Sequence, residues 1–287
     1  MNCICCLSKK LSKKPLGLTN HFLCRSCGFI FQINHNIDVD PKRIVDHYQK
    51  IDPHFAVARS KQAFFESAIG RLSNKIRKNG RSILDIGCGY GYFLELAQKA
   101  GWKAEGVEIT KQVAAMAKRK IGEKCIFTGK LKQAKYPKKS FHAITLWDVL
   151  VMVENPVEEV KECYRLLKPG GIIGIRVRNV LFQRFAYYAY KPFKKIGEIF
   201  GFKYPSVFHP YCYSSRSIEL LLRRLGFTKI QIINSPLTTG DPYKHAESTN
   251  IINMAKLCIR FLSKLIYGLS FKKWIVGPSI LVWAEKA

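Results

Sequence analysis

The hydrophobic and polar positions of this chain follow two periods, and together these predict the order of its helices and strands. The apolar run 83–86 predicts a buried strand, and further strands are predicted at 103–108, 124–128, 141–147, 171–177, 228–233 and 279–284. Apolar residues at helical spacing predict helices at 93–100, 113–120, 156–167 and 217–225. Strands that alternate with helices build a doubly wound, mostly parallel sheet, so the sequence predicts an α/β fold.

A glycine-rich turn connects the first of these strands to the first helix. Gly87, Gly89 and Gly91 stand at alternate positions, and residues without Cβ let the backbone turn sharply and approach a ligand closely. The next strand ends in Glu108, 23 residues beyond Asp85, where nucleotide-binding folds place a carboxylate that accepts the ribose hydroxyls. The stretch therefore predicts a site for an adenosine-containing ligand, with a purely structural turn as the alternative.

The details of this turn favour one cofactor. Tyr92 stands where a dinucleotide-binding turn has a small residue, and the chain has no GxxxxGK[ST] phosphate loop. Without a pyrophosphate to bind, Asp85 can face a cationic ammonium directly or through water. The segments LDIGCGYG and GVEIT resemble the cofactor site of class I methyltransferases that use S-adenosylmethionine.

This resemblance implies a Rossmann-like methyltransferase fold of seven strands, in which 279–284 supplies the antiparallel strand. It also implies a set of residues around the cofactor, which are Asp85, Gly87, Cys88, Gly89, Gly91, Glu108, Leu131 and Leu146. In this set Asp85 contacts the amino-acid end of the cofactor and Glu108 its ribose.

The second half of the chain extends the resemblance and departs from it at one place. Lys168 to Gly171 match the Lys-Pro-Gly-Gly turn of small-molecule methyltransferases, whereas Val151 and Met152 stand where Glu and His are usual. The HPYCYS run resembles a family segment near the site, so His209 is the expected general base, with a structural histidine as the alternative. Asp148 follows the fourth strand and is expected beside the transferred methyl group, unless it caps a helix.

Four cysteines near the N-terminus have the spacing of a metal site. Cys3 and Cys6 form one C-x2-C pair and Cys24 and Cys27 another, separated by 17 residues. Two such pairs predict a structural zinc site with four thiolate ligands and no open position for catalysis, with free buried cysteines as the alternative. The adjoining CGFIF resembles the second knuckle of a zinc ribbon. Cys5 leaves the ligand set of the first pair open between Cys3, Cys5 and Cys6.

The predicted domains are a zinc ribbon over 1–34, a helical segment leading into the sheet over 35–79, and a methyltransferase domain over 80–287. Within the last, 180–214 is aromatic and basic and is expected to cover the substrate, either by stacking on rings and phosphate or by packing as a helix. A basic amphipathic helix is expected within 247–270, covering the parent domain or a second subunit, or lying on an anionic bilayer.

The formal net charge of +28 widens the range of partners. It permits nucleic acid, an anionic membrane surface or an anionic small-molecule acceptor, although solvated surface lysines account for much of it. The absence of a long apolar stretch and of a signal-peptide pattern favours a cytoplasmic protein, with peripheral membrane contact as a variant.

These features predict an S-adenosylmethionine-dependent methyltransferase that transfers methyl to an oxygen of a sugar-like or other small-molecule acceptor. The first alternative is an RNA methyltransferase, which the zinc module, basic surface and aromatic residues suit. The chain lacks the Asn-Pro-Pro-aromatic segment that base-amine methyltransferases often use. The second alternative is a scaffold that binds the cofactor without turnover, for which the loss of Glu and His at Val151 and Met152 is the only support.

Overall fold

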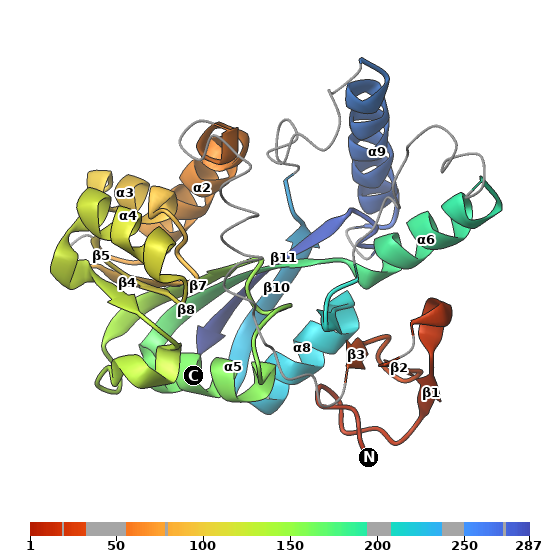
Figure 1. Cartoon of the computed structure of the whole chain (residues 1–287), viewed down its shortest axis with the longest axis horizontal. Helices are drawn as coiled ribbons and strands as arrows, with labels where there is room; N and C mark the ends of the chain where they lie inside the picture. The colour runs from red at the N-terminus through yellow and green to blue at the C-terminus, as the bar shows by residue number, and fades with distance from the viewer. Residues whose placement is uncertain (19, 33–55, 78–79, 194–207, 237–249, 272–273) are drawn as a thin grey trace.

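A computed structural model of the chain describes residues 1–18, 20–32, 56–77, 80–193, 208–236, 250–271 and 274–287. Its centre is a seven-stranded sheet in the order β10-β11-β8-β7-β4-β5-β6 (Figure 1). The strands from β8 to β6 are parallel to one another, and β11 runs antiparallel to both β8 and β10. This arrangement confirms the predicted fold class, including the antiparallel strand at 279–284.

The strands of this sheet are β4 (Ser82–Ile86), β5 (Lys103–Glu108), β6 (Ile126–Thr128), β7 (Phe141–Trp147), β8 (Leu167–Arg178), β10 (Phe227–Asn234) and β11 (Ser279–Lys286). The helices are α2 (Ala56–Lys75), α3 (Tyr92–Lys99), α4 (Lys111–Ile121), α5 (Pro156–Leu166), α6 (Val180–Tyr190), α8 (Ser215–Arg224) and α9 (Asn250–Leu269). Short 3-10 turns are η1 (Pro15–Gly17), η2 (Glu123–Cys125), η3 (Leu131–Ala134) and η4 (Lys191–Phe193).

The sheet separates two hydrophobic cores, because successive side chains of a strand point to opposite faces. On β11, Leu281 and Trp283 pack with α2 and α3, whereas Ile280 and Val282 pack with α5 and α8. Both faces of the central strands are thus covered, which explains why these strands are short apolar runs in the sequence. The predicted strand at 124–128 is shorter than expected, since Glu123–Cys125 forms a 3-10 turn and pairing begins at Ile126.

A second, smaller sheet lies at the N-terminus and takes one strand from far along the chain. Its order is β1-β2-β3-β9, where β1 is Leu11–Lys13, β2 is His21–Cys24, β3 is Ile30–Gln32 and β9 is Tyr211–Cys212. β9 pairs antiparallel with β3, with Ile30 opposite Cys212 and Phe31 opposite Tyr211. The N-terminal module is therefore joined to the segment that follows His209.

Two helices, α6 and α9, project from the sheet rather than covering its faces (Figure 1). α6 occupies the start of the predicted substrate cover, and α9 occupies the predicted amphipathic segment. Of the helices in the described ranges, none has the length and apolar character needed to span a bilayer. The rest of the 35–79 segment before Ala56, and residues 194–207 of the predicted cover, lie outside the described residues.

Candidate active site

The glycine turn after β4 has the conformation that its sequence predicts. Gly87, Gly89 and Gly91 all have positive φ angles, of 66°, 55° and 77°, a region in which side chains are strained. Space is also restricted, because a Cβ atom added to Gly87 would lie 2.4 Å from Cγ2 of Val149. The turn thus requires glycine at residue 87 for both backbone conformation and space.

Glu108 stands at the carboxyl end of β5, directly beside this turn. Its two carboxylate oxygens accept hydrogen bonds from the backbone N–H of Gly89 at 3.0 Å and of Thr110 at 2.9 Å. Burial raises the pKa of this carboxyl, and the two N–H donors act in the opposite direction. A carboxylate offers about four acceptor positions, so the two oxygens retain capacity for a pair of ribose hydroxyls.

Asp85 lies inside β4, just before the glycines. Its carboxyl is 2% exposed and accepts a hydrogen bond of 2.6 Å from Oγ1 of Thr145 on β7. Burial raises the pKa of Asp85 to about 8, and the hydrogen bond from Thr145 only partly opposes this effect. Such an enclosed carboxyl favours the water-mediated contact with an ammonium over the direct one.

Three other residues expected around the cofactor have their side chains in the hydrophobic cores. Leu131 and Leu146 are buried in the core beneath α5, and Cys88 is buried in the core beneath α3. They can face a ligand through their backbone only. Ile109, next to Glu108, instead exposes 45% of its surface.

Asp148 follows β7 with a φ angle of 64°, a conformation that is strained for a residue with a side chain. Its carboxylate accepts hydrogen bonds from Arg176 on β8 and from Nζ of Lys61 on α2, the latter at 3.2 Å. Burial acts to raise the pKa of Asp148, but the two cations prevail and lower it to about 2. The capping alternative is wrong, because Asn155 accepts hydrogen bonds from the first turn of α5.

His209 lies close to the residue that replaces the family's histidine. Its Nδ1 atom is 3.1 Å from Sδ of Met152, and the charges of Arg178 and Asp148 both act on its ring. Burial and Arg178 lower the pKa of His209 to about 4. The imidazole is therefore uncharged at neutral pH.

The four paired cysteines converge in the N-terminal module, which contains β1, β2 and β3 and which we call the cysteine module. The sulfur atoms of Cys3, Cys6, Cys24 and Cys27 all lie within 4.8 Å of one another. The separation is 3.6 Å for Cys3 and Cys27 and also for Cys6 and Cys24. A tetrahedral site with Zn–S bonds of about 2.3 Å has sulfur–sulfur edges of about 3.8 Å, so the cluster fits a zinc ion.

The two cysteine turns repeat the same backbone pattern. Leu7 N–H donates to the carbonyl of Cys3 and Gly28 N–H to that of Cys24, and both donors have positive φ angles, of 62° and 75°. The N–H of each first cysteine also donates across its turn, to Ser8 and to Phe29. Cys5 is buried and stands outside the four-sulfur group.

The strand β9 connects this module to the candidate active site. The Phe29 ring lies 6.1 Å from that of Tyr211 and 4.9 Å from that of Tyr213. On the other side of the segment, Tyr211 N–H donates to the carbonyl of Val151. The segment after His209 is thus held between the cysteine module and the loop that carries Met152.

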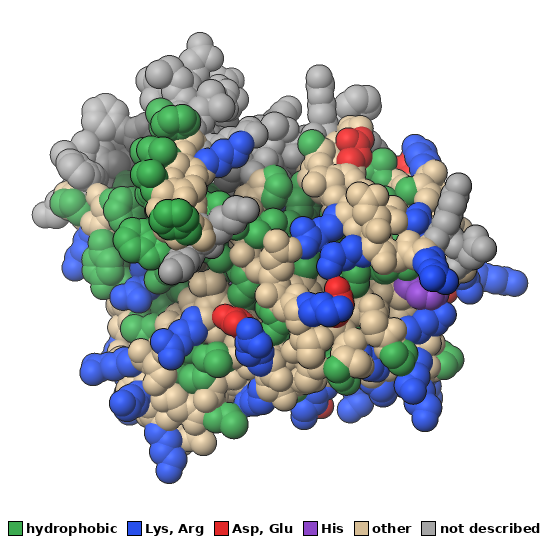
Figure 2. Space-filling model, turned by 180° about the vertical axis from the view of Figure 1, so that it is seen from behind, with side chains coloured by type: hydrophobic (Ala, Val, Ile, Leu, Met, Phe, Trp, Pro, Cys, Tyr) green, Lys and Arg blue, Asp and Glu red, His purple; other side chains and the backbone are tan. Residues whose placement is uncertain are grey.

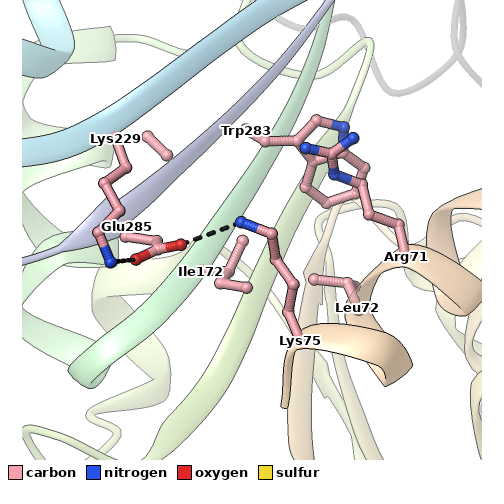
Figure 3. Close-up of a pocket in the computed structure, with 8 residues that line it drawn as sticks. Arg71, Leu72, Lys75, Ile172, Lys229, Trp283 and Glu285 are labelled. Carbon is pink, nitrogen blue, oxygen red and sulfur yellow. Dashed lines mark hydrogen bonds and ion pairs between the residues drawn. The ribbon is translucent and has the colours of Figure 1, made fainter.

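A small pocket elsewhere on the sheet is not part of this site (Figure 3). It lies at the amino end of β8, opposite to the glycine turn, and is lined by Arg71, Lys75, Lys229 and Glu285 among others. Glu285 pairs with both lysines, at 3.0 and 2.6 Å, and Arg71 lies over the ring of Trp283. These charges stabilise the packing of α2, β10 and β11.

Comparison with known proteins identifies the family of this chain. A methyltransferase domain family matches residues 57–232, which is more than half of the chain. The chain belongs to the class I methyltransferases. This confirms the resemblance of LDIGCGYG and GVEIT to an S-adenosylmethionine site.

Relatives and solved structures agree with this assignment. The methyltransferase is 34% identical over 107 residues to a ubiquinone biosynthesis O-methyltransferase of Idiomarina loihiensis, a match that covers 35% of this chain and 43% of that relative. A methyltransferase of Thermotoga maritima, described as a possible histamine N-methyltransferase, shares the fold with a TM-score of 0.53, 19% identity and coverage of 86% and 98% of the two chains. Phosphoethanolamine N-methyltransferase 2 of Haemonchus contortus, in complex with S-adenosylmethionine, has a TM-score of 0.54, 16% identity and coverage of 88% and 58%.

Several residues of the site were not expected from the sequence. Lys61 and Arg176 hold Asp148, and Val149 lies against Gly87. Only Arg176 carried a signal, because an arginine within the apolar run IIGIRV must find a buried partner. Lys61 resembles any lysine on a helix surface.

Proposed function

We propose that this methyltransferase transfers the methyl group of S-adenosylmethionine to an oxygen atom of a small-molecule acceptor. The observation that carries the proposal is the carboxylate of Glu108, oriented by two backbone N–H groups beside a turn of glycines. The O-methyltransferases among the relatives support oxygen as the acceptor atom. The sugar-like nature of the acceptor stays a prediction from the sequence.

The residues around the glycine turn fit this cofactor, which supplies an electrophilic methyl group when bound. Glu108 would accept the ribose hydroxyls, and Ile109 would contact the base with its exposed side chain. Gly87 would allow the backbone to approach the ligand closely. Asp85 would hold the ammonium through water, with its proton released as the cation binds.

On the acceptor side, Asp148 and His209 would orient the hydroxyl that is methylated. A histidine with a pKa of about 4 is a weak base at neutral pH, so His209 would accept a hydrogen bond rather than carry the proton away. The three positive charges of Lys61, Arg176 and Arg178 exceed the single negative charge of Asp148. This local positive potential would favour an acceptor hydroxyl that has released its proton to solvent, and the resulting oxyanion would be the more reactive nucleophile.

The test of the cofactor site is calorimetric titration with S-adenosylmethionine and S-adenosylhomocysteine. Glu108→Ala is expected to weaken binding at least tenfold, or about 1.4 kcal/mol. Glu105→Ala, on the same strand but outside the turn, is the matched control and should leave affinity unchanged. Failure of the folded wild-type protein to bind either compound would overturn the proposal.

We also propose that Cys3, Cys6, Cys24 and Cys27 bind one structural zinc ion. The repeated turns place four thiolates at tetrahedral spacing, and metal binding would stabilise a module with a small hydrophobic core. Because β3 of this module pairs with β9, the ion would also stabilise the segment beside the acceptor position.

Metal analysis of the purified protein tests this assignment. We expect about one zinc ion per chain in the wild type, and its loss in Cys24→Ala. Cys5→Ala is the matched control, since Cys5 is buried in the same module but stands outside the sulfur cluster. Equal zinc content in the three proteins would contradict the assignment.

A further inference from the structure

Exposed hydrophobic side chains are concentrated on α6, α9 and the segment after α9. These regions hold nine of the thirteen large hydrophobic residues that are exposed among the described positions. The nine are Leu181, Phe185, Tyr188, Phe261, Leu262, Leu265, Leu269, Phe271 and Trp274. Monomeric soluble proteins rarely expose such a concentration of apolar surface without a function for it. We call these nine residues the α6–α9 surface.

On α9, the apolar face points away from the protein. Phe261, Leu265 and Leu269 recur every four residues, so they lie along one side of the helix, and each is exposed. Ser263 is the buried residue of the last two turns, and Tyr267 packs against the main core. Figure 2 shows the resulting column of hydrophobic side chains at the upper left of the view, where α9 lies. Covering the parent domain, as expected from the sequence, does not account for this face.

α6 presents a second apolar face of the same kind. Leu181, Phe185 and Tyr188 are spaced by four and three residues and are all exposed, whereas Val180 and Gln183 on the other side are buried. Phe185 exposes 71% of its surface.

The start of α6 and the segment after α9 meet at the carboxyl end of β8. Asn179, the residue that caps α6, donates from its side chain to the carbonyls of Ile275 and Gly277 in the segment after α9, both at 2.9 Å. Asn179 directly follows Arg178 at the carboxyl end of β8. Val180 N–H also donates to the carbonyl of Tyr213, four residues beyond His209.

The charge of these segments is of one sign. Residues 180–193 and 250–278 contain Arg184, Lys191, Lys256, Arg260, Lys264, Lys272 and Lys273 but no aspartate or glutamate. Figure 2 shows that lysine and arginine side chains also outnumber acidic ones on that face of the molecule. Apolar residues that include Phe and Trp, flanked by lysine and arginine, are typical of helices that lie in the interface of an anionic bilayer.

We propose that the α6–α9 surface docks on an anionic lipid membrane, with its nine side chains inserted among the acyl chains and the lysines and arginines of residues 180–193 and 250–278 at the headgroups. A second copy of the chain is a poorer occupant, because a symmetric contact would bring together two copies of segments that contain lysine and arginine and no acidic residue. In combination with the proposed function, this docking places the acceptor position of the enzyme next to the bilayer.

Vesicle flotation of the full-length protein tests the docking. We expect binding to phosphatidylcholine vesicles that contain about 30% phosphatidylglycerol, weak binding to phosphatidylcholine alone, and release at high salt. The variant Phe261→Ser/Leu265→Ser/Leu269→Ser should reduce binding at least tenfold. Glu158→Ser/Lys161→Ser, with two exposed and mutually paired residues on α5, is the control and should bind as the wild type does.

Two measurements separate the other outcomes. The midpoint of thermal unfolding should be the same for the triple variant and the wild type, since the three side chains are exposed. Light scattering reports self-association: a wild-type dimer that the triple variant dissociates, without vesicle binding, would identify a subunit interface and overturn the proposal. Equal vesicle binding of the wild type and the triple variant would overturn it as well. S-adenosylmethionine binding is scored separately, so failure of the docking leaves the proposed function intact.

Discussion

Substitution of Gly87 by alanine is expected to destabilise the protein through two separable effects. The positive φ angle of 66° costs an alanine about 1 kcal/mol. The added Cβ would also lie 2.4 Å from Cγ2 of Val149, a contact that forces one of the two side chains or the backbone to move. Such overpacking costs about 1–3 kcal/mol. The expected loss is therefore about 2–4 kcal/mol in the free energy of unfolding.

Three further variants separate these effects. Gly101 has a φ angle of 82° and nothing within 4 Å of an added Cβ, so Gly101→Ala measures the backbone cost alone. Val149→Ala removes the obstructing methyl groups, so the double variant Gly87→Ala/Val149→Ala should be more stable than the sum of the single effects by about 1–2 kcal/mol. Urea unfolding monitored by tryptophan fluorescence gives all four free energies.

The result that would refute this reasoning is an equal loss in Gly87→Ala and Gly101→Ala, with no coupling to Val149. The calorimetric titration adds a second test on the same proteins. Because Gly87 lies in the proposed cofactor turn, Gly87→Ala should also weaken S-adenosylmethionine binding, whereas Gly101→Ala should not. A stable Gly87→Ala protein with unchanged affinity would show that the turn does not approach the ligand.

Three further predictions follow from the titration and packing of named residues. Burial raises the pKa of Asp85 to about 8, and a bound cation favours its ionised form. The affinity for S-adenosylmethionine should therefore fall roughly tenfold from pH 8 to pH 6.5. Calorimetry of the wild type relative to Asp85→Asn measures this fall. A ratio of wild-type to Asp85→Asn affinity that does not change with pH would show that Asp85 does not interact with the ligand. The pKa of Asp148 is lowered from 3.8 to about 2. Its ionised form therefore contributes about 2 kcal/mol to the free energy of unfolding above pH 5, and this contribution is lost toward pH 2. The difference in urea stability between the wild type and Asp148→Asn should shrink over the same range. Phe29→Ala removes a buried ring and should cost about 3 kcal/mol, with faster hydrogen exchange at Tyr211 and Cys212; unchanged exchange there would show that Phe29 does not hold β9.

The sheet was predictable because burial of both faces leaves a strong signal in the sequence. The central strands β4, β7 and β8 contain apolar runs, and the residues at the strand ends, Glu108 and the glycines, are types that this position requires. The errors occur where local hydrogen bonding overrides the pattern. At Lys124 the chain turns before it pairs, and at Leu167 pairing begins earlier than the first apolar run of β8.

The acceptor side was less predictable because its geometry depends on contacts distant in sequence. β9 consists of Tyr211 and Cys212 alone, too short for a periodic signal, and it pairs with residues about 180 positions away. The lowered pKa of His209 depends on burial and on Arg178, neither of which its neighbours in the sequence indicate. The ion pairs of Asp148 likewise join β7 to α2 and β8.

The sharing of one sheet by the cysteine module and β9 decides how this chain can be divided. A truncation at residue 35, where composition suggests a domain boundary, would remove β3 and leave β9 with an uncovered edge, which favours aggregation. It would also remove the Phe29 ring from Tyr213 and the carbonyl of Cys27 that accepts a hydrogen bond from Ser214. A chimaera that exchanges acceptor specificity between relatives would therefore have to transfer the cysteine module and the 209–214 segment as one unit.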